Sequence, residues 1–527
     1  MTLSDAIVIG SGHAGVACAK ALVDAGVRTT VVDASVPREG NRQATFDTLS
    51  QSEPEQWSRD LLETARSYFP ASIRGVPLKP AYGSYFPYAL DDVDFRVEQV
   101  RSSARSSLAR GGLSNTWGAA MLPYRQEDIQ DWPIRVSDLE PHYRAVLSFV
   151  PLVGEHDDLT KLLPMYADPV SRLRRTPQVE RVAEHWQAHQ RQLVERGFLF
   201  GSSRLAVVAD QARDDHCRYC GLCMHGCPYG SIYNSWHSLR ELVDRKRVTH
   251  RVGLFVDRLR EEDGRVVLEY HERDRSGHGV LRADRVFVAC GTISTTRLIA
   301  ESMAEPPASV HLVDSQTFTM PLLTPRSSVV STENQGNTLA QLFLEVEDET
   351  VASRTVHLQL YGYSDIMLKA ILHRLPAERA TAERLLRPLI GRLVVMHGFV
   401  HSDDSPGFTI ERLADGIRTV GDESEDSRAV VTRLLAKMRR SAIDLGMIPV
   451  PMLTQVGLPG KSFHTGGSFP MRRRPGRLES DLLGRPTGFD RVHVVDSSVF
   501  PSVPATTIAL TAMANAHRIG SAAAALG

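Results

Sequence analysis

No excess of either charge is present in this sequence. Its 527 residues include 61 Lys and Arg against 62 Asp and Glu, which gives a formal net charge of −1. A surface this balanced cannot neutralise the phosphates of a nucleic acid, so we expect no nucleic-acid partner. Proline (29) and glycine (38) occur at ordinary frequency, which excludes collagen-like and low-complexity chains.

Long hydrophobic runs are also lacking. No stretch approaches the roughly 18 consecutive apolar residues that a membrane-spanning helix needs, so we expect no membrane span. The chain enters the apolar stretch 6–10 without the basic segment, long apolar segment and cleavage site of a secretory signal. These absences favour a cytoplasmic location, while export together with a partner subunit stays open.

Cysteine is scarce, with six residues in the chain, and four of the six fall within eleven positions. The four are Cys217, Cys220, Cys223 and Cys227. Spacings this short, in a chain without a secretory signal, favour metal binding or redox chemistry over a disulfide scaffold. They reproduce the cysteine spacing of bacterial ferredoxins, which predicts an iron–sulfur cluster, most simply 4Fe-4S. A zinc site, a cluster with fewer of these ligands, and plain buried or paired cysteines are the alternatives.

A dinucleotide-binding fingerprint opens the chain. The apolar stretch 6–9 predicts a strand, and Gly10, Gly12 and Gly15 follow in the spacing GxGxxG before a predicted helix. The first glycine permits a tight turn, the second lets the backbone approach a pyrophosphate, and the third lets helix and strand pack closely. Asp33 ends the next predicted strand and can accept hydrogen bonds from an adenosine ribose. The motif alone does not separate FAD from NAD.

The middle of the chain has a different pattern from its two ends. From about 308 to 463, alternating apolar and polar residues predict a mostly antiparallel sheet. The strands are expected at 339–346, 355–361, 393–400 and 408–412. Helices are expected at 137–150, 178–195, 235–246 and 363–390, while 36–110 is polar with few periodic signals. The last segment, 464–527, combines glycine-rich turns, a strand at 492–495 and an alanine-rich helix.

Several blocks, taken together and in order, resemble the glucose–methanol–choline (GMC) oxidoreductases. Besides the glycine fingerprint, the blocks are 111–119, 132–133, 138–143, 286–298, 464–471 and 494–501. The resemblance covers most of the chain, whereas residues 300–460 are similar only in style. Substrate choice would be determined in that middle segment.

The resemblance implies a fold with two domains. One is an α/β FAD-binding domain of the Rossmann-like GMC type, and the other is an α+β substrate domain built on a mainly antiparallel sheet. The FAD-binding domain would be assembled from residues 1–40, 100–120, 200–307 and 464–527, including the cysteine segment 217–228. The substrate domain and insertions would take 41–99, 121–199 and 308–463.

The resemblance also implies FAD instead of NAD as the cofactor. Besides the fingerprint, the family's cofactor-binding blocks match Gly112, Ser114, Asn115, Val256, Ala289, Gly291, Asp496 and Ser497. In some relatives a His of the glycine-rich loop holds the flavin covalently. The comparable positions 115–117 contain no His, so we expect non-covalent FAD. Some relatives that pass electrons to a cytochrome partner carry an iron–sulfur cluster in the region of this cysteine segment.

The activity implied is that of a dehydrogenase oxidising a CH–OH group of a sugar, polyol or glycoside. Such a reaction sends a hydride to flavin N5 and needs a positioned base for the hydroxyl proton. The family's base matches His464, whose imidazole can be neutral near pH 7 and still accept a proton. The family's second His or Asn matches Thr507, which can donate one hydrogen bond but cannot share the proton. An ordinary helix-capping role for Thr507 stays open.

The partners implied are a small-molecule alcohol or sugar and, through the iron–sulfur cluster, a redox protein as electron acceptor. Two other functions stay open. One is an oxygen-using alcohol or sugar oxidase of the same family, and the other is a redox-neutral lyase or isomerase on the same fold. A purely electron-transferring subunit is disfavoured, because the block around His464 would then have no role.

Overall fold

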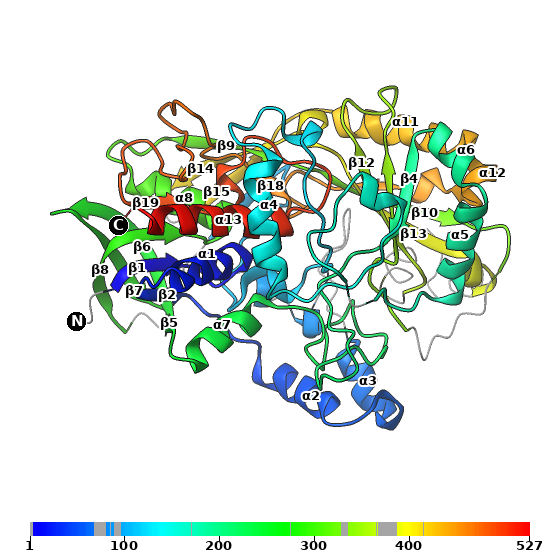
Figure 1. The fold of residues 1–527 in the computed structure, drawn as a ribbon, viewed down its shortest axis with the longest axis horizontal. Helices are drawn as coiled ribbons and strands as arrows, with labels where there is room; N and C mark the ends of the chain where they lie inside the picture. The colour runs from blue at the N-terminus through cyan, green and yellow to red at the C-terminus, as the bar shows by residue number, and fades with distance from the viewer. Residues whose placement is uncertain are drawn as a thin grey trace.

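The computed structural model describes residues 1–527 except 1–3, 68–78, 80, 85, 89–95, 170, 274–275, 328–335, 365, 367–386, 415 and 527. The helices expected at 363–390 therefore lie largely outside the described residues. Three sheets organise the rest of the chain. Two of them lie toward opposite ends of the elongated molecule (Figure 1).

The first sheet is built on the glycine fingerprint. Its parallel strands are β5 (Val248–Val252), β2 (Thr29–Asp33), β1 (Ser4–Ile9), β8 (His278–Val288) and β19 (Val492–Val494) in spatial order. An antiparallel ribbon of β6 (Leu254–Glu262) and β7 (Arg265–Glu272) continues the sheet from the first half of β8. Strand β2 is buried along its whole length, as expected of a parallel strand covered on both faces. The strands predicted around the fingerprint are confirmed.

Helices from the two ends of the chain cover this sheet together. Helix α1 (His13–Asp24) follows β1, and α13 (Ala509–Ala524) lies beside it (Figure 1). Gly520 permits the contact, because a Cβ there would lie 3.2 Å from the carbonyl oxygen of Cys18. Helix α4 (Val136–Leu147) packs on α13, α7 (Ser235–Asp244) packs on α1, and α8 (Thr292–Ser302) packs on β6.

The second sheet is antiparallel, as predicted for the middle of the chain. Its order is β16 (Ile448–Pro449), β10 (Thr317–Leu323), β13 (Leu393–Phe399), β12 (Val356–Tyr361), β11 (Leu342–Val346) and β4 (Phe198–Ser202), and β17 (Gln455–Val456) also pairs with β10. Within the described residues, four helices pack at this end of the molecule (Figure 1). They are α5 (Pro177–Ala188), α6 (Gln190–Glu195), α11 (Asp426–Arg440) and α12 (Ala442–Leu445).

Alternate residues of the second sheet point to opposite faces, and the two faces differ in polarity. The side chains that share an apolar core with the helices are Phe318, Met320, Leu322, Leu358, Leu360, Val394 and Met396. Their neighbours on the other face are Thr317, Thr319, Pro321, Gln359, Tyr361, Val395, His397 and Phe399. One face therefore anchors the sheet, and the other is free to bind a ligand.

The third sheet joins distant parts of the chain. Its order is β18 (Thr465–Gly466), β9 (Ser309–Asp314), β14 (Phe408–Leu413), β15 (Gly416–Gly421) and β3 (Val97–Val100). Short 3₁₀ turns occur at 54–56, 81–83, 86–88, 112–115, 127–129, 158–161, 387–392, 402–404, 451–453 and 497–499. The pairing of β18 with the end of β9 fixes the segment that carries His464.

The segment 36–110 contains two helices that its sequence does not predict. Helix α2 (Gly40–Ser50) and helix α3 (Arg59–Ala65) form a small core with the cysteine segment through Phe46, Leu49 and Leu222. The apolar periodicity of α2 is weak because only Phe46 and Leu49 are buried along its length. The packing against another segment, and not a regular apolar face, specifies this helix.

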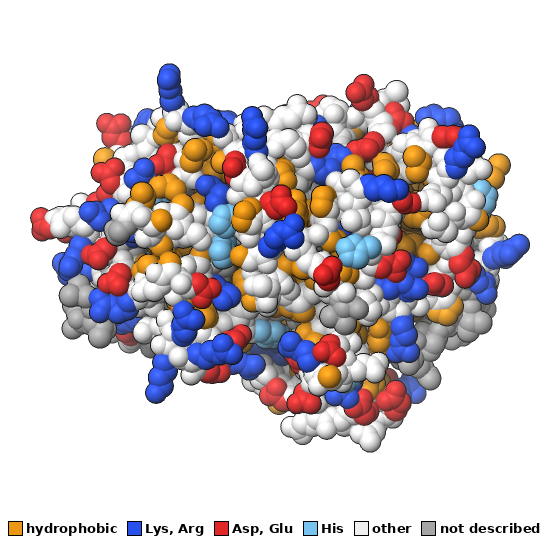
Figure 2. Space-filling model, in the orientation of Figure 1, with side chains coloured by type: hydrophobic (Ala, Val, Ile, Leu, Met, Phe, Trp, Pro, Cys, Tyr) orange, Lys and Arg blue, Asp and Glu red, His pale blue; other side chains and the backbone are white. Residues whose placement is uncertain are grey.

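The face of the molecule shown in Figure 2 has no patch of like-charged side chains among its described residues. Lys and Arg side chains are interspersed there with Asp and Glu side chains. This distribution agrees with the formal net charge of −1.

Candidate active site

A cavity of about 450 Å³ connects the first sheet to the polar face of the second. Its wall begins at Asp33 and the fingerprint loop, passes the segments 105–109 and 112–118, and reaches β10, β12 and β13. His464 and Thr507 line the same cavity. The structure therefore brings the predicted dinucleotide site and the two predicted catalytic side chains to one continuous space.

The three fingerprint glycines serve different purposes in this wall. A Cβ on Gly10 would lie 2.4 Å from the oxygen of Ala289, and a Cβ on Gly15 would lie 2.0 Å from the oxygen of Gly10. Both positions are thus closed by the protein itself. A Cβ on Gly12 would meet no protein atom within 4 Å, because Gly12 faces the cavity at the N-terminus of α1. This open position at a helix N-terminus fits the pyrophosphate of FAD.

Asp33 lines the cavity beside the fingerprint loop, and its contact with the adenosine of FAD stays a prediction. Its Oδ2 accepts the backbone N–H of Ser11 at 2.7 Å, and its Oδ1 accepts the hydroxyl of Ser35 at 2.6 Å. Oδ1 also accepts the N–H of Ser35 at 2.5 Å, which uses both of its lone pairs, so Oδ2 is the oxygen that can still accept a ribose hydroxyl. The hydrogen bond to Ser11 also fixes the fingerprint loop to the end of β2.

The glycine-rich loop 111–118 contributes backbone to the cavity more than polar side chains. Gly112 lines the cavity, with a φ of 57° that favours glycine. The hydroxyl of Ser114 donates to the oxygen of Gly111, and the amide of Asn115 donates to the oxygen of Gly112 at 2.7 Å. Ser114 and Asn115 hold the loop together and are not among the residues that line the cavity. Their direct contact with FAD stays a prediction.

The remaining predicted cofactor residues all line the cavity, namely Val256, Ala289, Gly291, Asp496 and Ser497. The buried carboxylate of Asp496 accepts the N–H of Gly291 at 3.0 Å and the hydroxyl of Thr295 at 2.5 Å. Burial raises the pKa of Asp496, and these hydrogen bonds oppose the rise. Asp496 therefore fixes the start of α8 against β19, where the second part of the cofactor wall begins.

His464 lies at the far end of the cavity from Asp33. Its ring stacks on Phe399, with 4.4 Å between the centroids and 15° between the planes. Its Nδ1 is buried and finds no hydrogen-bond partner in the described part of the chain, which leaves Nε2 for the cavity. Burial lowers the pKa of His464 to about 3, and the imidazoles of His397 and His357 add to the effect. The side chain is therefore a neutral acceptor at physiological pH.

A short chain of hydrogen bonds positions the backbone of His464. Asp314 accepts the hydroxyl of Ser462 at 2.6 Å, and the same hydroxyl oxygen accepts the N–H of His464 at 2.9 Å. Phe463 has a φ of 60°, a left-handed conformation that is rare outside glycine. Burial raises the pKa of Asp314 to about 7, against its hydrogen bonds to Ser462 and Gly460. Strained backbone held by buried polar groups is typical of functional loops.

Thr507 also lines the cavity, but its hydroxyl is already engaged. It donates to the oxygen of Ala120 at 3.3 Å. The residue that caps α13 is Ile508, and no side chain caps the helix, so Thr507 is not its N-cap. The Thr507 hydroxyl can accept a hydrogen bond from a ligand and has no hydrogen left to donate.

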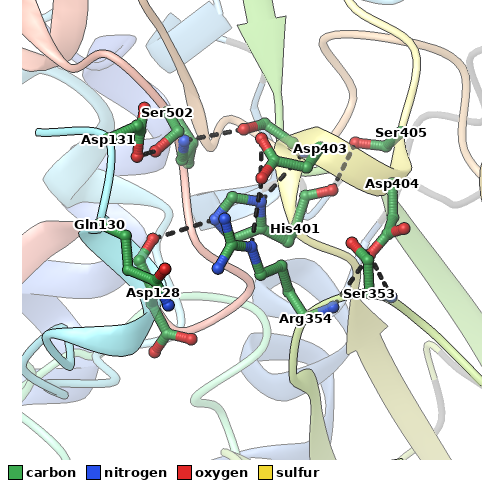
Figure 3. A network of polar contacts seen from close by, with 12 residues as sticks. Asp128, Gln130, Asp131, Ser353, Arg354, His401, Asp403, Asp404, Ser405 and Ser502 are labelled. Carbon is green, nitrogen blue, oxygen red and sulfur yellow. Dashed lines mark hydrogen bonds and ion pairs between the residues drawn. The ribbon is translucent and has the colours of Figure 1, made fainter. Parts of the chain in front are cut away.

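A polar network holds the segment before Thr507 against the end of β13 (Figure 3). The buried His401 accepts the N–H of Asp403 at 3.0 Å and donates from Nε2 to the oxygen of Asp128 at 3.1 Å. Ser502 donates to Asp131 at 2.8 Å (Figure 3). Segments near residues 130, 400 and 500 are joined in this way beside the cavity.

The second sheet adds residues to the cavity that are not predicted from the sequence. They include His397, Phe399, Gln359 and Tyr361, on β12 and β13. The sequence contains a signal for these residues: in β12 and β13, polar residues alternate with apolar ones that are mostly Leu and Val. Alternation of this kind is usually read as a solvent-facing side, and only the fold shows that it faces a cavity.

Lys461 adds a cation to the same end of the cavity. Burial lowers its pKa to about 7, and the positive charge of Arg105, which also lines the cavity, adds to the effect. Lys461 forms no ion pair within the described ranges of the chain. Its ammonium group, charged or neutral near pH 7, can donate a hydrogen bond to a ligand or to the flavin.

The four clustered cysteines are all free thiols in the structure. Burial raises the pKa of Cys217 to about 12, and the charge of Cys223 adds to the effect. The neighbouring Met224 lines the cavity, so the cysteine segment borders the cofactor wall. Among the described residues, no three His, Cys, Asp or Glu side chains are grouped as a bound metal ion requires. The thiols supply the donor chemistry of an iron–sulfur cluster, but the structure does not show them arranged around one.

No helix in the part of the chain that the structure describes is long and apolar enough to cross a membrane. This agrees with the prediction from the sequence. The cytoplasmic location stays a prediction.

Comparisons with known proteins support FAD as the cofactor of this chain. Residues 5–85 match the model of a family described as an FAD binding domain. No curated protein sequence matches the chain significantly. Among solved structures, pyridoxine 4-oxidase from Mesorbium loti has a TM-score of 0.61 and 16% identity, with 98% of each chain covered.

A second solved structure has the same overall fold. It is a variant of formate oxidase from Aspergillus oryzae RIB40, studied for its FAD modification, with a TM-score of 0.63 and 12% identity. The match covers 98% of this chain and 97% of the other. At these identities the comparisons establish the fold, which is the two-part α/β and antiparallel-sheet fold that the GMC resemblance implies. The chain therefore has an FAD-binding domain within the overall fold of these two oxidases.

Proposed function

We propose that this protein is an FAD-dependent dehydrogenase that oxidises a CH–OH group of a sugar, polyol or glycoside. One observation carries the proposal: a neutral, buried imidazole, that of His464, lines the same cavity as the open glycine cradle at Gly12. FAD, when bound, supplies the acceptor for the hydride that leaves the alcohol carbon. The chain itself must then bind the alcohol and remove its hydroxyl proton.

His464 is the base in this proposal. Its Nε2 accepts the hydroxyl proton of the substrate, since Nδ1 is buried in the protein. The stacked ring of Phe399 and the hydrogen bond from the His464 N–H to Ser462 hold the imidazole in place. A base with a lowered pKa is not blocked by a proton before the substrate arrives.

The oxidase alternative also has a specific observation in its favour. Both solved structures of the same fold bear the name of an oxidase. The cysteine segment favours a dehydrogenase, because an iron–sulfur cluster would give a bound flavin a one-electron acceptor other than dioxygen. We propose Cys217, Cys220, Cys223 and Cys227 as the ligands of this cluster. Their ferredoxin spacing and free thiols support the assignment.

Anaerobic stopped-flow bleaching of the flavin tests the proposal. A panel of sugars, polyols, glycosides and simple alcohols is mixed with the purified holoenzyme, and the flavin absorbance is followed. We expect at least one class to bleach the flavin, and His464→Ala to keep bound FAD while bleaching about 10²- to 10⁴-fold more slowly. His156→Ala, at an exposed side chain outside the cavity, is the matched control.

Three results would contradict the proposal in different ways. Full bleaching in the His464→Ala variant would remove the base from the mechanism. Conversion of a substrate without any bleaching would favour the redox-neutral lyase or isomerase. Fast reoxidation of the reduced enzyme by dioxygen, compared with a one-electron acceptor, would favour the oxidase.

A further inference from the structure

Three imidazoles surround the ring of Phe399 at the end of the cavity. They are His464, with 4.4 Å between ring centroids, His397 at 4.8 Å and His357 at 6.2 Å. His464 and His397 line the cavity, and His357 does not. Among the described residues, the rings of His464 and His397 do not contact each other. Each of these two cavity-lining imidazoles contacts Phe399 instead.

The hydrogen bonds of His357 use both of its ring nitrogens. The amide group of Gln359 donates to Nε2 at 3.2 Å, so Nδ1 carries the hydrogen and donates it to Glu345 at 2.6 Å. The hydroxyl of Tyr361 donates to the amide oxygen of Gln359 at 2.8 Å. The hydroxyl hydrogen of Tyr361 and one amide hydrogen of Gln359 are thus used within this row, which ends on the buried carboxylate of Glu345, and the second amide hydrogen of Gln359 is left over among the described residues. His357 is therefore a structural group, and Tyr361 offers the cavity only the lone pairs of its hydroxyl.

The hydrogen bonds of His397 leave one ring nitrogen for the cavity. Its Nε2 pairs with the hydroxyl of Thr317, and that hydroxyl donates its hydrogen to the oxygen of Gly398 at 3.0 Å. Both contacts are hydrogen bonds at the same time when Thr317 accepts from His397, and this fully paired arrangement places the hydrogen of the neutral ring on Nε2. The other nitrogen, Nδ1, is then an acceptor, and burial keeps the ring neutral by lowering its pKa to about 4.

Among the described residues at this end of the cavity, acceptors outnumber donors, which are the ammonium group of Lys461 and the second amide hydrogen of Gln359. His464, the Nδ1 of His397, the hydroxyl of Tyr361 and the hydroxyl of Thr507 can each accept a hydrogen bond from a ligand. A ligand that leaves such buried acceptors unpaired loses affinity. Complementarity thus favours a ligand with several hydroxyl donors close together.

We propose that His397 is a specificity-determining residue that accepts a hydrogen bond from a second hydroxyl of the substrate, next to the hydroxyl that His464 deprotonates. This inference rests on the proposed function and names its substrate class: vicinal diols, polyols and sugars over simple alcohols. The inference also places a second imidazole beside His464, on β13. The family resemblance instead matches the position of the family's second His or Asn to Thr507. Thr317 is a positioning residue, because it selects the tautomer of His397.

The test compares ligands that differ by one hydroxyl. Glycerol, propane-1,2-diol and propan-1-ol, and glucose with 2-deoxyglucose, are added anaerobically to the oxidised holoenzyme. Spectral perturbation of the flavin gives the dissociation constant, and bleaching gives the rate where oxidation occurs. We expect the ligand with the additional hydroxyl to bind about 10- to 100-fold more tightly, a typical range for pairing a buried polar group. In His397→Leu this preference should disappear, while the affinity for propan-1-ol stays within about threefold.

Two further variants distinguish this role from a structural one. His397→Asn retains a hydrogen-bond acceptor and should recover part of the preference for the additional hydroxyl. Thr317→Val removes the partner that fixes the tautomer of His397, so it should weaken this preference while the imidazole remains. FAD content and thermal melting identify a variant that has not folded.

An equal loss for both members of each pair would overturn the inference, and so would an undiminished preference in His397→Leu. If no ligand bleaches the flavin but the diol preference depends on His397, the proposed oxidation fails and the binding inference stands. If alcohols bleach the flavin without any preference for a second hydroxyl, the oxidation stands and this inference fails.

Discussion

At the scale of the single residue, the environment of His464 predicts an unusual pH dependence. A free imidazole is protonated below about pH 6.5 and would stop acting as a base there. Burial lowers the pKa of His464 to about 3, so the base is free of its proton throughout the range above that value. We expect the rate of flavin reduction by substrate to be nearly constant as the pH falls from 8 to 5. Stopped-flow measurement across this range checks it.

The control for this prediction is Asp314, a buried carboxyl at the end of β9 that contacts the loop of His464. Asp314 has a pKa raised to about 7 by burial, and it holds Ser462 beside His464. A loss of rate near pH 7 that disappears in Asp314→Asn would belong to that carboxyl. Lys461, with a pKa lowered to about 7, also lies on this loop, so a loss centred near pH 6.5 that persists in both Asp314→Asn and Lys461→Met would show an ordinary histidine and contradict the assignment.

At the scale of the element, different glycines of the fingerprint loop are needed for folding and for cofactor binding. A Cβ on Gly15 would lie 2.0 Å from the oxygen of Gly10, whereas a Cβ on Gly12 would meet no protein atom within 4 Å. We expect Gly12→Ala to fold with near-normal secondary structure and to lose FAD, since the methyl occupies the pyrophosphate position. Gly15→Ala should fail to fold or melt at a much lower temperature, because the contact between helix and strand is blocked.

Flavin absorbance and circular dichroism of the two variants provide the measurement. Gly26→Ala is the control for changing a nearby glycine, as a Cβ there also meets nothing within 4 Å and the residue lies outside the cavity. Its φ of 81° adds backbone strain, so it should lower stability without releasing FAD. Retention of FAD by Gly12→Ala would place the pyrophosphate elsewhere.

Local pattern was enough to predict some elements and insufficient for others. The strand, glycine turn and helix from β1 to β2 are specified by residues that are close in sequence, and so are the alternating strands β11 to β14. Helices α2 and α3 are specified by distant packing on Leu222, which no local window contains. The same limit applies to the site: His464 lies in a recognisable block, while His397 becomes a candidate only when the fold stacks His464 on Phe399, its neighbour on the same face of β13.

At the scale of the whole molecule, the cavity is built from segments that span almost the entire chain. Its wall includes residues from Ile9 to Ala512. The network around His401 joins three of these segments beside Thr507, as Figure 3 shows for Asp128, Asp403 and Ser502. The position of Thr507 therefore depends on segments that are far apart in the sequence, and domain boundaries drawn along the sequence divide residues that line one cavity.

The cysteine segment concerns the whole molecule, because it could carry electrons from the cavity to an acceptor. Met224 lines the cavity, and Cys220 packs in the core formed with α2 and α3. If the four thiols bind a cluster, the anaerobically purified protein contains iron and acid-labile sulfide, and Cys220→Ser loses most of both. We expect this variant to keep its FAD and its rate of bleaching by substrate, while reoxidation by a one-electron acceptor slows. Cys18→Ser, a buried thiol on α1 away from the segment, is the control. Protein free of iron would remove the cluster, and it would leave dioxygen as the better candidate for the acceptor.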